Sequence, residues 1–193
     1  TTIASTDLIR QKWLDNDFYG LTFSMDYDNS RLHAILGGSY NIYYGRAWGN
    51  IIWAEYASNS DPYYKWYNSN SVKQDFNIYG KLSYRINDLF GFFADLQYRH
   101  IDWEMEGTED AYGDITQDHV FNFVNPKAGI NCQINQRNEA YFSFAVANRE
   151  PSRQNYIDAS EDPVKPTNET LYDFELGYAY KTPKMSLMVN GFY

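Results

Sequence analysis

The chain of 193 residues has few cysteines, few basic residues and no long apolar run, and each of these absences excludes a common class of protein. It has one cysteine, Cys132, which excludes an intrachain disulfide, and its three scattered histidines leave no Cys/His spacing typical of zinc sites. It has 16 basic residues against 25 acidic ones, and no concentrated Lys/Arg patch, which argues against a nucleic-acid partner. No apolar run reaches about 18 residues, the length that a membrane-spanning helix needs.

Aromatic residues, in contrast, make up 19% of the chain, although its mean hydropathy is only −0.62. Apolar residues recur at every second position in eight segments, and this period indicates β-strands with one apolar face. The segments span residues 19–27, 32–40, 76–86, 90–98, 127–134, 140–146, 172–180 and 184–193.

Short and long connections alternate between these segments. Tight-turn residues lie at Asp28–Ser30, Asn87–Asp88, Asn135–Asn138 and Thr182–Pro183, and the long connections span about 44–73, 105–118 and 148–168. An antiparallel up-and-down meander with one trimmed end and one elaborated end is typical of transmembrane β-barrels, with short periplasmic turns and long extracellular loops. Strands of about ten residues, tilted near 45 degrees, cover roughly 24 Å, which suits such a barrel. A soluble β-sandwich with one solvated face per sheet remains the alternative.

Several strings resemble the barrel of TonB-dependent outer-membrane receptors. The most specific are NPKAG at 125–129, ANREPSR at 147–153 and ETLYDFELGY at 169–178, and the resemblance covers about Leu8 to Tyr193. It implies an all-β fold in which about eight strands form the C-terminal part of a barrel of about 22 strands. Residues 1–193 are then expected to be a partial barrel domain, with the plug domain and the signal peptide absent from this chain.

The resemblance also implies a function. Members of this family take up scarce, large ligands such as an iron chelate, cobalamin or a glycan, with energy relayed by TonB. The expected location is the outer membrane of a Gram-negative cell, and the expected partners are outer-membrane lipid, the protein's own plug domain, TonB and the extracellular ligand. An autonomous eight-stranded outer-membrane barrel that acts as an adhesin or structural anchor is the second hypothesis.

Charged residues on the polar faces of the predicted strands are candidates for contact with the plug or for lining the transport route. We expect them to face the lumen and to form one cluster of alternating sign. A structural ion-pair ladder between neighbouring strands is the alternative role. The residues are Arg99, Lys127, Arg149, Asp173 and Glu175.

Aromatic residues of the predicted long loop Gly45–Ser71 are candidates for ligand binding, because amphipathic rings stack on sugars and flat chelates. The alternative is that they pack the loop on itself or form the outer aromatic girdle. They are Trp48, Trp53, Tyr63, Tyr64, Trp66 and Tyr67. Relatives commonly carry an acidic residue and a histidine where this chain has Arg46-Ala47-Trp48-Gly49, so the family's loop role is not carried over to this stretch.

Two further features were weighed for chemistry. The acidic loop Met105–Asp118 offers oxygen ligands for calcium, but its spacing does not match an EF-hand, and a solvated loop is the simpler interpretation. Motifs of nucleophilic, zinc-dependent and phosphate-binding enzymes are missing. We therefore expect no enzyme activity, no cofactor and no metal.

Overall fold

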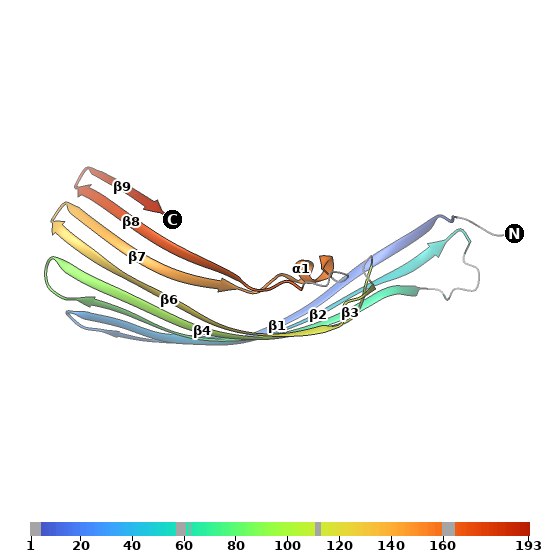
Figure 1. The fold of residues 1–193 in the computed structure, drawn as a ribbon. Coiled ribbons are helices and arrows are strands. Elements are labelled where there is room, and N and C mark those ends of the chain that lie inside the picture. Colours follow the sequence, from blue (N-terminus) through green and yellow to red (C-terminus); the bar gives the residue numbers. More distant parts are fainter. Residues whose placement is uncertain (1–4, 57–60, 62, 111–112, 160–164) are drawn as a thin grey trace.

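The computed structural model describes residues 5–56, 61, 63–110, 113–159 and 165–193. It contains one antiparallel sheet of nine strands in the order β1-β2-β3-β4-β6-β7-β8-β9, with the two-residue β5 paired to β4 (Figure 1). The elements are β1 (Leu8–Asp28), β2 (Leu32–Ala54), β3 (Tyr64–Arg85), β4 (Phe90–Glu109), β5 (Gly113–Asp114), β6 (Gln117–Asn135), β7 (Asn138–Arg149), α1 (Arg153–Asp158), β8 (Glu169–Thr182) and β9 (Met185–Phe192).

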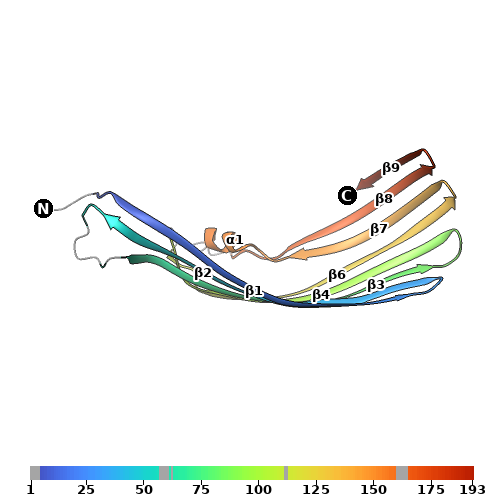
Figure 2. The same cartoon turned by 180° about the vertical axis from the view of Figure 1, so that it is seen from behind.

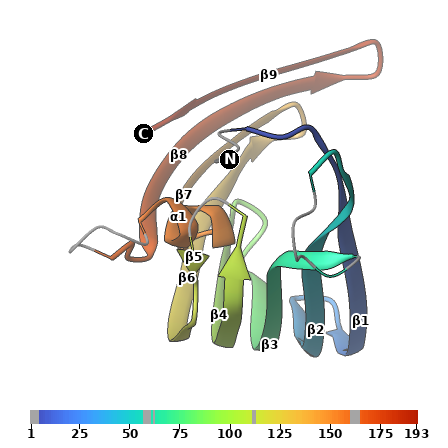
Figure 3. The same cartoon turned by 90° about the vertical axis from the view of Figure 1, so that its right-hand side faces the viewer.

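The sheet is strongly curved and open. Seen from the end in Figure 3, it forms a trough, and the short helix α1 lies inside the curve. The strand order ends at β1 on one side and at β9 on the other, and these two strands are not paired with each other. We call the concave face that carries α1 the inner face and the convex face the outer face. None of the described helices is long and apolar enough to cross a membrane.

The short turns that follow β1, β3, β6 and β8 lie together at the trimmed end of the sheet (Figure 2). Asparagine side chains explain the first three of them. Asn29 Oδ1 accepts hydrogen bonds from the backbone N–H groups of Arg31 and Leu32, both at 2.9 Å. Asn87 and Asn135 repeat this arrangement at the next two hairpins. Because such Asx turns reverse the chain locally, the sequence positions of these asparagines determine where the strands pair.

The two faces of the sheet differ as the alternation predicts. Register pairs Leu21 with Tyr40 and Leu96 with Pro126, and these positions belong to the outer face. Outer-face side chains such as Leu21, Leu96 and Leu176 are more than half exposed, at 73%, 55% and 65%. Leaving so much apolar surface uncovered is costly in water, so the band suits contact with lipid.

The apolar band ends at charged residues on β1. Tyr19, Leu21, Phe23, Met25 and Tyr27 alternate along its outer face, whereas Asp17 and Asp15 follow toward the elaborated end. The eight steps from Tyr27 to Tyr19 correspond to roughly 20 Å of height at a tilt near 40 degrees. The band is therefore about as tall as the hydrocarbon layer, and the first half of β1 continues beyond it.

The expected strand lengths were wrong at this end. Strand β1 begins at Leu8 instead of near Tyr19, and β2 and β3 extend the hairpin to Ala54 and Tyr64. The predicted loop Gly45–Ser71 is therefore mostly strand, because β2 ends only at Ala54 and β3 begins at Tyr64. The predicted alternation of short and long connections is confirmed, since the other two long connections lie between β4 and β6 and between β7 and β8.

Candidate functional site

The inner face carries a connected set of charges that we call the inner-wall network: Lys73, Asp75, Arg99 and Glu150. Arg99 Nε on β4 donates to Asp75 Oδ2 on β3 at 3.0 Å, and Arg99 Nη1 donates to Glu150 Oε2 at 3.0 Å. Lys73 Nζ donates to Glu150 Oε1 at 2.7 Å. The side chain of Glu150 is only 11% exposed. The network therefore ties the segment after β7 to two strands that come much earlier in the chain.

The charges of this network stabilise each other. Burial alone would raise the pKa of Glu150, but the hydrogen bond from Lys73 and the positive charges of Lys73 and Arg99 outweigh it, so the pKa lies below the ordinary value. Lys73 Nζ also lies 4.8 Å from the ring centroid of Trp103, within the range of a cation–π contact. Glu150 is therefore ionised at neutral pH, with both cations held against it.

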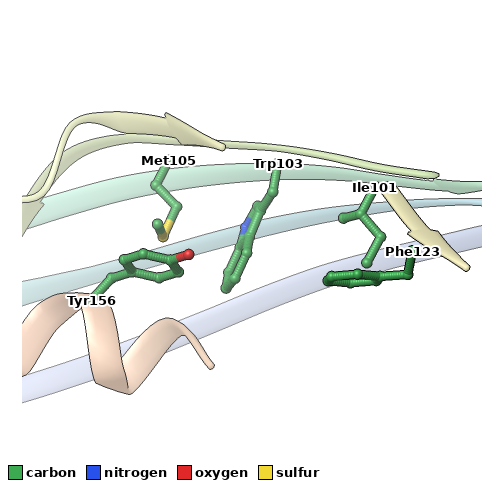
Figure 4. Close-up of a cluster of buried hydrophobic side chains, with 5 residues drawn as sticks. All are labelled: Ile101, Trp103, Met105, Phe123 and Tyr156. Carbon is green, nitrogen blue, oxygen red and sulfur yellow. The ribbon is translucent and has the colours of Figure 1, made fainter. Parts of the chain in front are cut away.

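Beside the network, α1 packs a buried aromatic residue onto the sheet. Figure 4 shows Tyr156 of α1 pointing at Trp103 and Met105 of β4. The rings of Tyr156 and Trp103 meet edge to face with centroids 5.8 Å apart, and His119 of β6 stacks on Tyr156 at 4.0 Å. Tyr156 is 1% exposed. Tyr156, Trp103 and Met105 form, with Ile101 and Phe123, the main buried apolar cluster of the described chain.

Two polar contacts fix the beginning of α1. Ser152 and Asn155 form a reciprocal capping box at its N-terminus. Arg153 Nη2 donates to Glu109 Oε2 at 2.6 Å and to Ser69 Oγ at 3.1 Å. A six-residue helix has little stability of its own, so these contacts and Tyr156 determine its position.

A cavity of about 200 Å³ opens on the inner face between β1–β4 and the start of α1. Its wall combines an aromatic surface with polar groups, including Tyr43, Ser71, Lys73, Trp103 and Arg153. Ser71 Oγ accepts a hydrogen bond from Trp103 Nε1 at 2.8 Å, which orients the indole. The volume is smaller than a typical pocket for a drug-sized molecule, so the cavity suits one polar portion of a larger ligand.

Nearer the elaborated end, Asp110 joins the connection after β4 to the other side of the trough. Asp110 Oδ2 accepts from Lys12 Nζ of β1 at 2.6 Å, and Asp110 Oδ1 accepts from Trp66 Nε1 of β3 at 2.5 Å. Arg10 lies 5.3 Å from the Trp66 ring centroid. The hydrogen bonds from Lys12 and then from Trp66 lower the pKa of Asp110. The connection therefore reaches over β3 and β2 to hold β1.

Replacing Asp110 by asparagine is expected to loosen this connection. Hydrogen exchange of residues 107–109 and 113–116 should become roughly threefold faster, because an ion pair whose lysine is more than half exposed contributes little. Since the pKa of Asp110 is lowered, wild-type protection is retained at neutral pH and is lost as the pH falls below the ordinary aspartate value near 3.8. The asparagine variant should lack this acid dependence. Unchanged exchange and an unchanged pH profile in the variant would contradict the role of Asp110.

The structure separates the aromatic residues that were predicted to lie in one loop. Trp48 shares the outer face with Trp13, and the two rings stack with centroids 6.0 Å apart. Trp66 and Tyr67 lie at a bulge of β3 on the inner side, where Trp66 contacts Asp110. Trp53 and Tyr64 belong to the strand ends, and Tyr63 lies in the turn with a φ of 62°. Of the six residues, Trp66 and Tyr67 therefore lie on the inner face, and their role in ligand binding stays a prediction.

The five predicted lumen residues do not form one cluster. The register places Lys127, Asp173 and Glu175 on the same face as Arg99, as predicted. However, Arg99 pairs with Asp75 and Glu150 instead. Among the described residues, Asp173 and Glu175 make no ion pair, and Lys127 lies 6.0 Å from the Phe93 ring centroid.

Arg149 is the fifth of these residues, and it pairs with Glu169 at 2.6 Å, with both side chains well exposed. This pair joins β7 to β8 and fits the alternative of a structural ladder. The prediction of a single cluster was therefore wrong, because matching faces do not bring together residues at different heights.

Residues that the sequence did not single out supply most of the site. Lys73 and Asp75 follow the alternation of β3, so the sequence could predict their position on the inner face. It could not predict their partners, Glu150 and Arg99. Glu150 follows the last paired residue of β7, where the alternation rule no longer applies. In the acidic stretch Met105–Asp118, which was interpreted as a solvated loop, Glu109 and Asp110 are paired with basic side chains.

Comparison with solved structures gives the fold. The copper transporter OprC matches with a TM-score of 0.74 at 12% identity, over 95% of this chain and 30% of OprC. The ferric yersiniabactin uptake receptor FyuA from Yersinia pestis matches with 0.65 at 12%, over 98% and 30%. The alcaligin outer membrane receptor FauA from Bordetella pertussis matches with 0.64 at 13%, over 95% and 29%.

The expected fold class, part of an antiparallel up-and-down β-barrel, is confirmed by these matches and by the open, curved sheet. The chain spans about 30% of the length of the proteins that it matches. The expected location in the outer membrane agrees with this fold. No protein-family profile and no curated protein matches the sequence.

Proposed function

We propose that this chain is part of the barrel wall of a TonB-dependent outer-membrane receptor that takes up a scarce, large ligand. The observation that carries the proposal is the division of the sheet into an apolar outer face and a charged, hydrogen-bonded inner face, in a fold shared with uptake receptors. An open sheet leaves unpaired backbone groups at β1 and β9, which a membrane does not tolerate. Further strands therefore complete the barrel, around a plug domain that TonB engages.

The ligand class is a metal chelate, cobalamin or a glycan. The matched proteins are a copper transporter and receptors for ferric yersiniabactin and alcaligin, and these names favour a metal or a metal chelate. The cations of the inner-wall network and of α1 already have carboxylate partners. These groups then contribute hydrogen bonds and an aromatic wall to the ligand, instead of a strong net charge.

The proposal is tested first on the native protein. An antibody against this chain should detect, in outer-membrane fractions, a band several times heavier than 22.6 kDa. Uptake of radioactive iron as ferric citrate, of radioactive cobalamin and of a labelled oligosaccharide is then compared in cells with and without the full-length gene. We expect one of these probes to depend on the gene and on the proton-motive force. A band close to 22.6 kDa would favour the autonomous barrel acting as adhesin or anchor.

Of the six aromatic residues predicted for ligand binding, Trp66 is the one that lies on the inner face and is partly exposed, so we propose that it contacts the ligand. Replacing Trp66 by alanine in the full-length protein should weaken ligand binding about tenfold, because an inner-face ring that stacks on a ligand contributes on the order of 1 kcal/mol. Trp48→Ala is the matched control, since Trp48 lies on the outer face and should leave binding unchanged. Ligand binding by Asp110→Asn shows how much of the Trp66→Ala effect comes from the lost hydrogen bond to Asp110 and how much from the lost ring. Equal effects of the Trp66 and Trp48 substitutions would contradict the assignment.

A further inference from the structure

An aromatic pair lies on the outer face of β1 and β2, above the apolar band. Trp13 and Trp48 are directly opposite in the register, and their indole planes are 9° apart at a centroid distance of 6.0 Å. Trp13 remains 46% exposed, although it is a large aromatic residue. We call these two residues the outer indole pair. Because they lie on the opposite face from α1 and the cavity, they are not part of the inner-wall site.

The height of this pair excludes the hydrocarbon layer. Trp13 follows Tyr19 by six steps toward the elaborated end, which is roughly 15 Å of height at a tilt near 40 degrees. Between them, the outer face carries Asp15 and Asp17, which contact Arg46 at 3.2 and 4.0 Å. A charged group of this kind does not lie in hydrocarbon. An ordinary headgroup region is only about 5 to 8 Å thick on each side, so the indoles also lie beyond phospholipid headgroups.

The surroundings of the pair are charged, without an excess of basic groups. Lys65 Nζ lies 5.5 Å from the Trp48 ring centroid, and Arg46 stands below the pair between two carboxylates. Two basic and two acidic side chains therefore frame the indoles. The same outer face also carries the exposed Glu104 and Glu106 of β4, so it has no excess of positive charge to attract phosphate groups. Exposed aromatic rings flanked by carboxylates and basic groups instead suit a sugar, whose C–H face stacks on the ring while its hydroxyls form hydrogen bonds.

We propose that the outer indole pair binds the sugar headgroup of the outer-leaflet glycolipid that surrounds the barrel. The inference rests on the proposed placement in the outer membrane, whose outer leaflet consists of lipopolysaccharide. The pair lies directly above the lipid-contacting band on the same face of the same strands, so a glycolipid whose acyl chains cover the band extends its core sugars along the wall to this height. The bound sugar would then be a fixed neighbour of the receptor and distinct from any transported ligand.

The test uses the full-length protein, purified from outer membranes and reconstituted in nanodiscs. Binding of rough lipopolysaccharide, which carries core sugars, is compared with binding of deep-rough glycolipid, which lacks most of them. The wild type should prefer the sugar-bearing form, and Trp13→Ala/Trp48→Ala should bind it about tenfold more weakly, as expected for two lost stacking contacts. Trp13→Phe/Trp48→Phe should retain most of the affinity. Trp66→Ala, on the inner face, is the control and should bind as the wild type does.

Several results would overturn the proposal. These are equal binding of both glycolipids by the wild type, unchanged binding by the double alanine variant, or a dimer that the double alanine variant dissolves. The heat-modifiable migration of each variant on gels shows whether its barrel is folded. Ligand uptake by the double alanine variant distinguishes the proposed uptake function from the proposed sugar site. Normal uptake together with lost sugar binding would support both proposals and show that they depend on different residues. Wild-type protein that is absent from outer-membrane fractions would instead refute the proposed function.

Discussion

Replacing Glu150 by glutamine should release the segment that carries α1 from the inner face. The substitution leaves Lys73 without a charged partner and removes one of two carboxylates from Arg99, in a site where all three side chains are at least three-quarters buried. Breaking such a pair costs about 2 to 3 kcal/mol, somewhat less than for a fully buried one. Amides of residues 153–159 should then exchange with solvent about 30-fold faster or more in the full-length protein.

A pair elsewhere in the same connection supplies the control. Glu169 also contacts an arginine, Arg149, at 2.6 Å, but its side chain is 65% exposed and that of Arg149 is 72% exposed. Glu169→Gln should change exchange by less than about threefold, because exposed ion pairs contribute little. If both substitutions had the same small effect, the inner-wall network would not hold α1, and burial would be a poor guide to the contribution of these pairs.

The pH dependence gives Glu150 a second signature. Its pKa is lowered in the folded protein, so its contribution is fully present above the ordinary glutamate value near 4.5 and is lost as the pH falls through the folded value. Protection of α1 in the wild type should therefore fall below about pH 4.5. The glutamine variant should show low protection at neutral pH and little further loss in acid.

Period-two alternation predicted the faces of the sheet, because the outer face is apolar over the band and the inner face is polar. It failed for the upper half of β1, where Asp15 and Asp17 occupy the outer positions. There the strand is continued by backbone pairing and by cross-strand contacts such as Trp13 with Trp48. The hydrophobic pattern does not reflect these interactions, so the upper part of the β2–β3 hairpin, about 44–73, was interpreted as a long loop.

The same limit explains the inner-wall network. Alternation placed Arg99 on the inner face but did not identify its partners, which depend on the register between strands and on the path of the chain after Arg149. The turns at Asn29, Asn87 and Asn135 fix that register at the trimmed end, and all three were predicted from the sequence as turn residues. The segment of Glu150 has no such local signal. Its position depends on a few contacts of α1 with the sheet.

Replacing Tyr156 by alanine should have a similarly large effect for an apolar reason. Its ring is 1% exposed and packs against Trp103, Met105 and His119. Removing a buried aromatic ring costs about 3 to 5 kcal/mol, which a six-residue helix cannot recover from its own hydrogen bonds. Residues 153–159 should lose exchange protection and become sensitive to protease. The cavity beside Lys73 and Trp103 would then lose its cover, so ligand affinity should fall as well.

Tyr156→Phe distinguishes the ring from the hydroxyl. The Tyr156 hydroxyl is buried and has no hydrogen-bond partner among the described residues, so removing it should change stability by no more than about 1 kcal/mol and can increase it. Protection of α1 and ligand affinity should therefore stay close to wild type. A phenylalanine variant as damaged as the alanine variant would mean that the hydroxyl, and not aromatic packing, holds the helix. An intact phenylalanine variant beside a damaged alanine variant would show that the packing of the Tyr156 ring on Trp103 positions the inner-wall network.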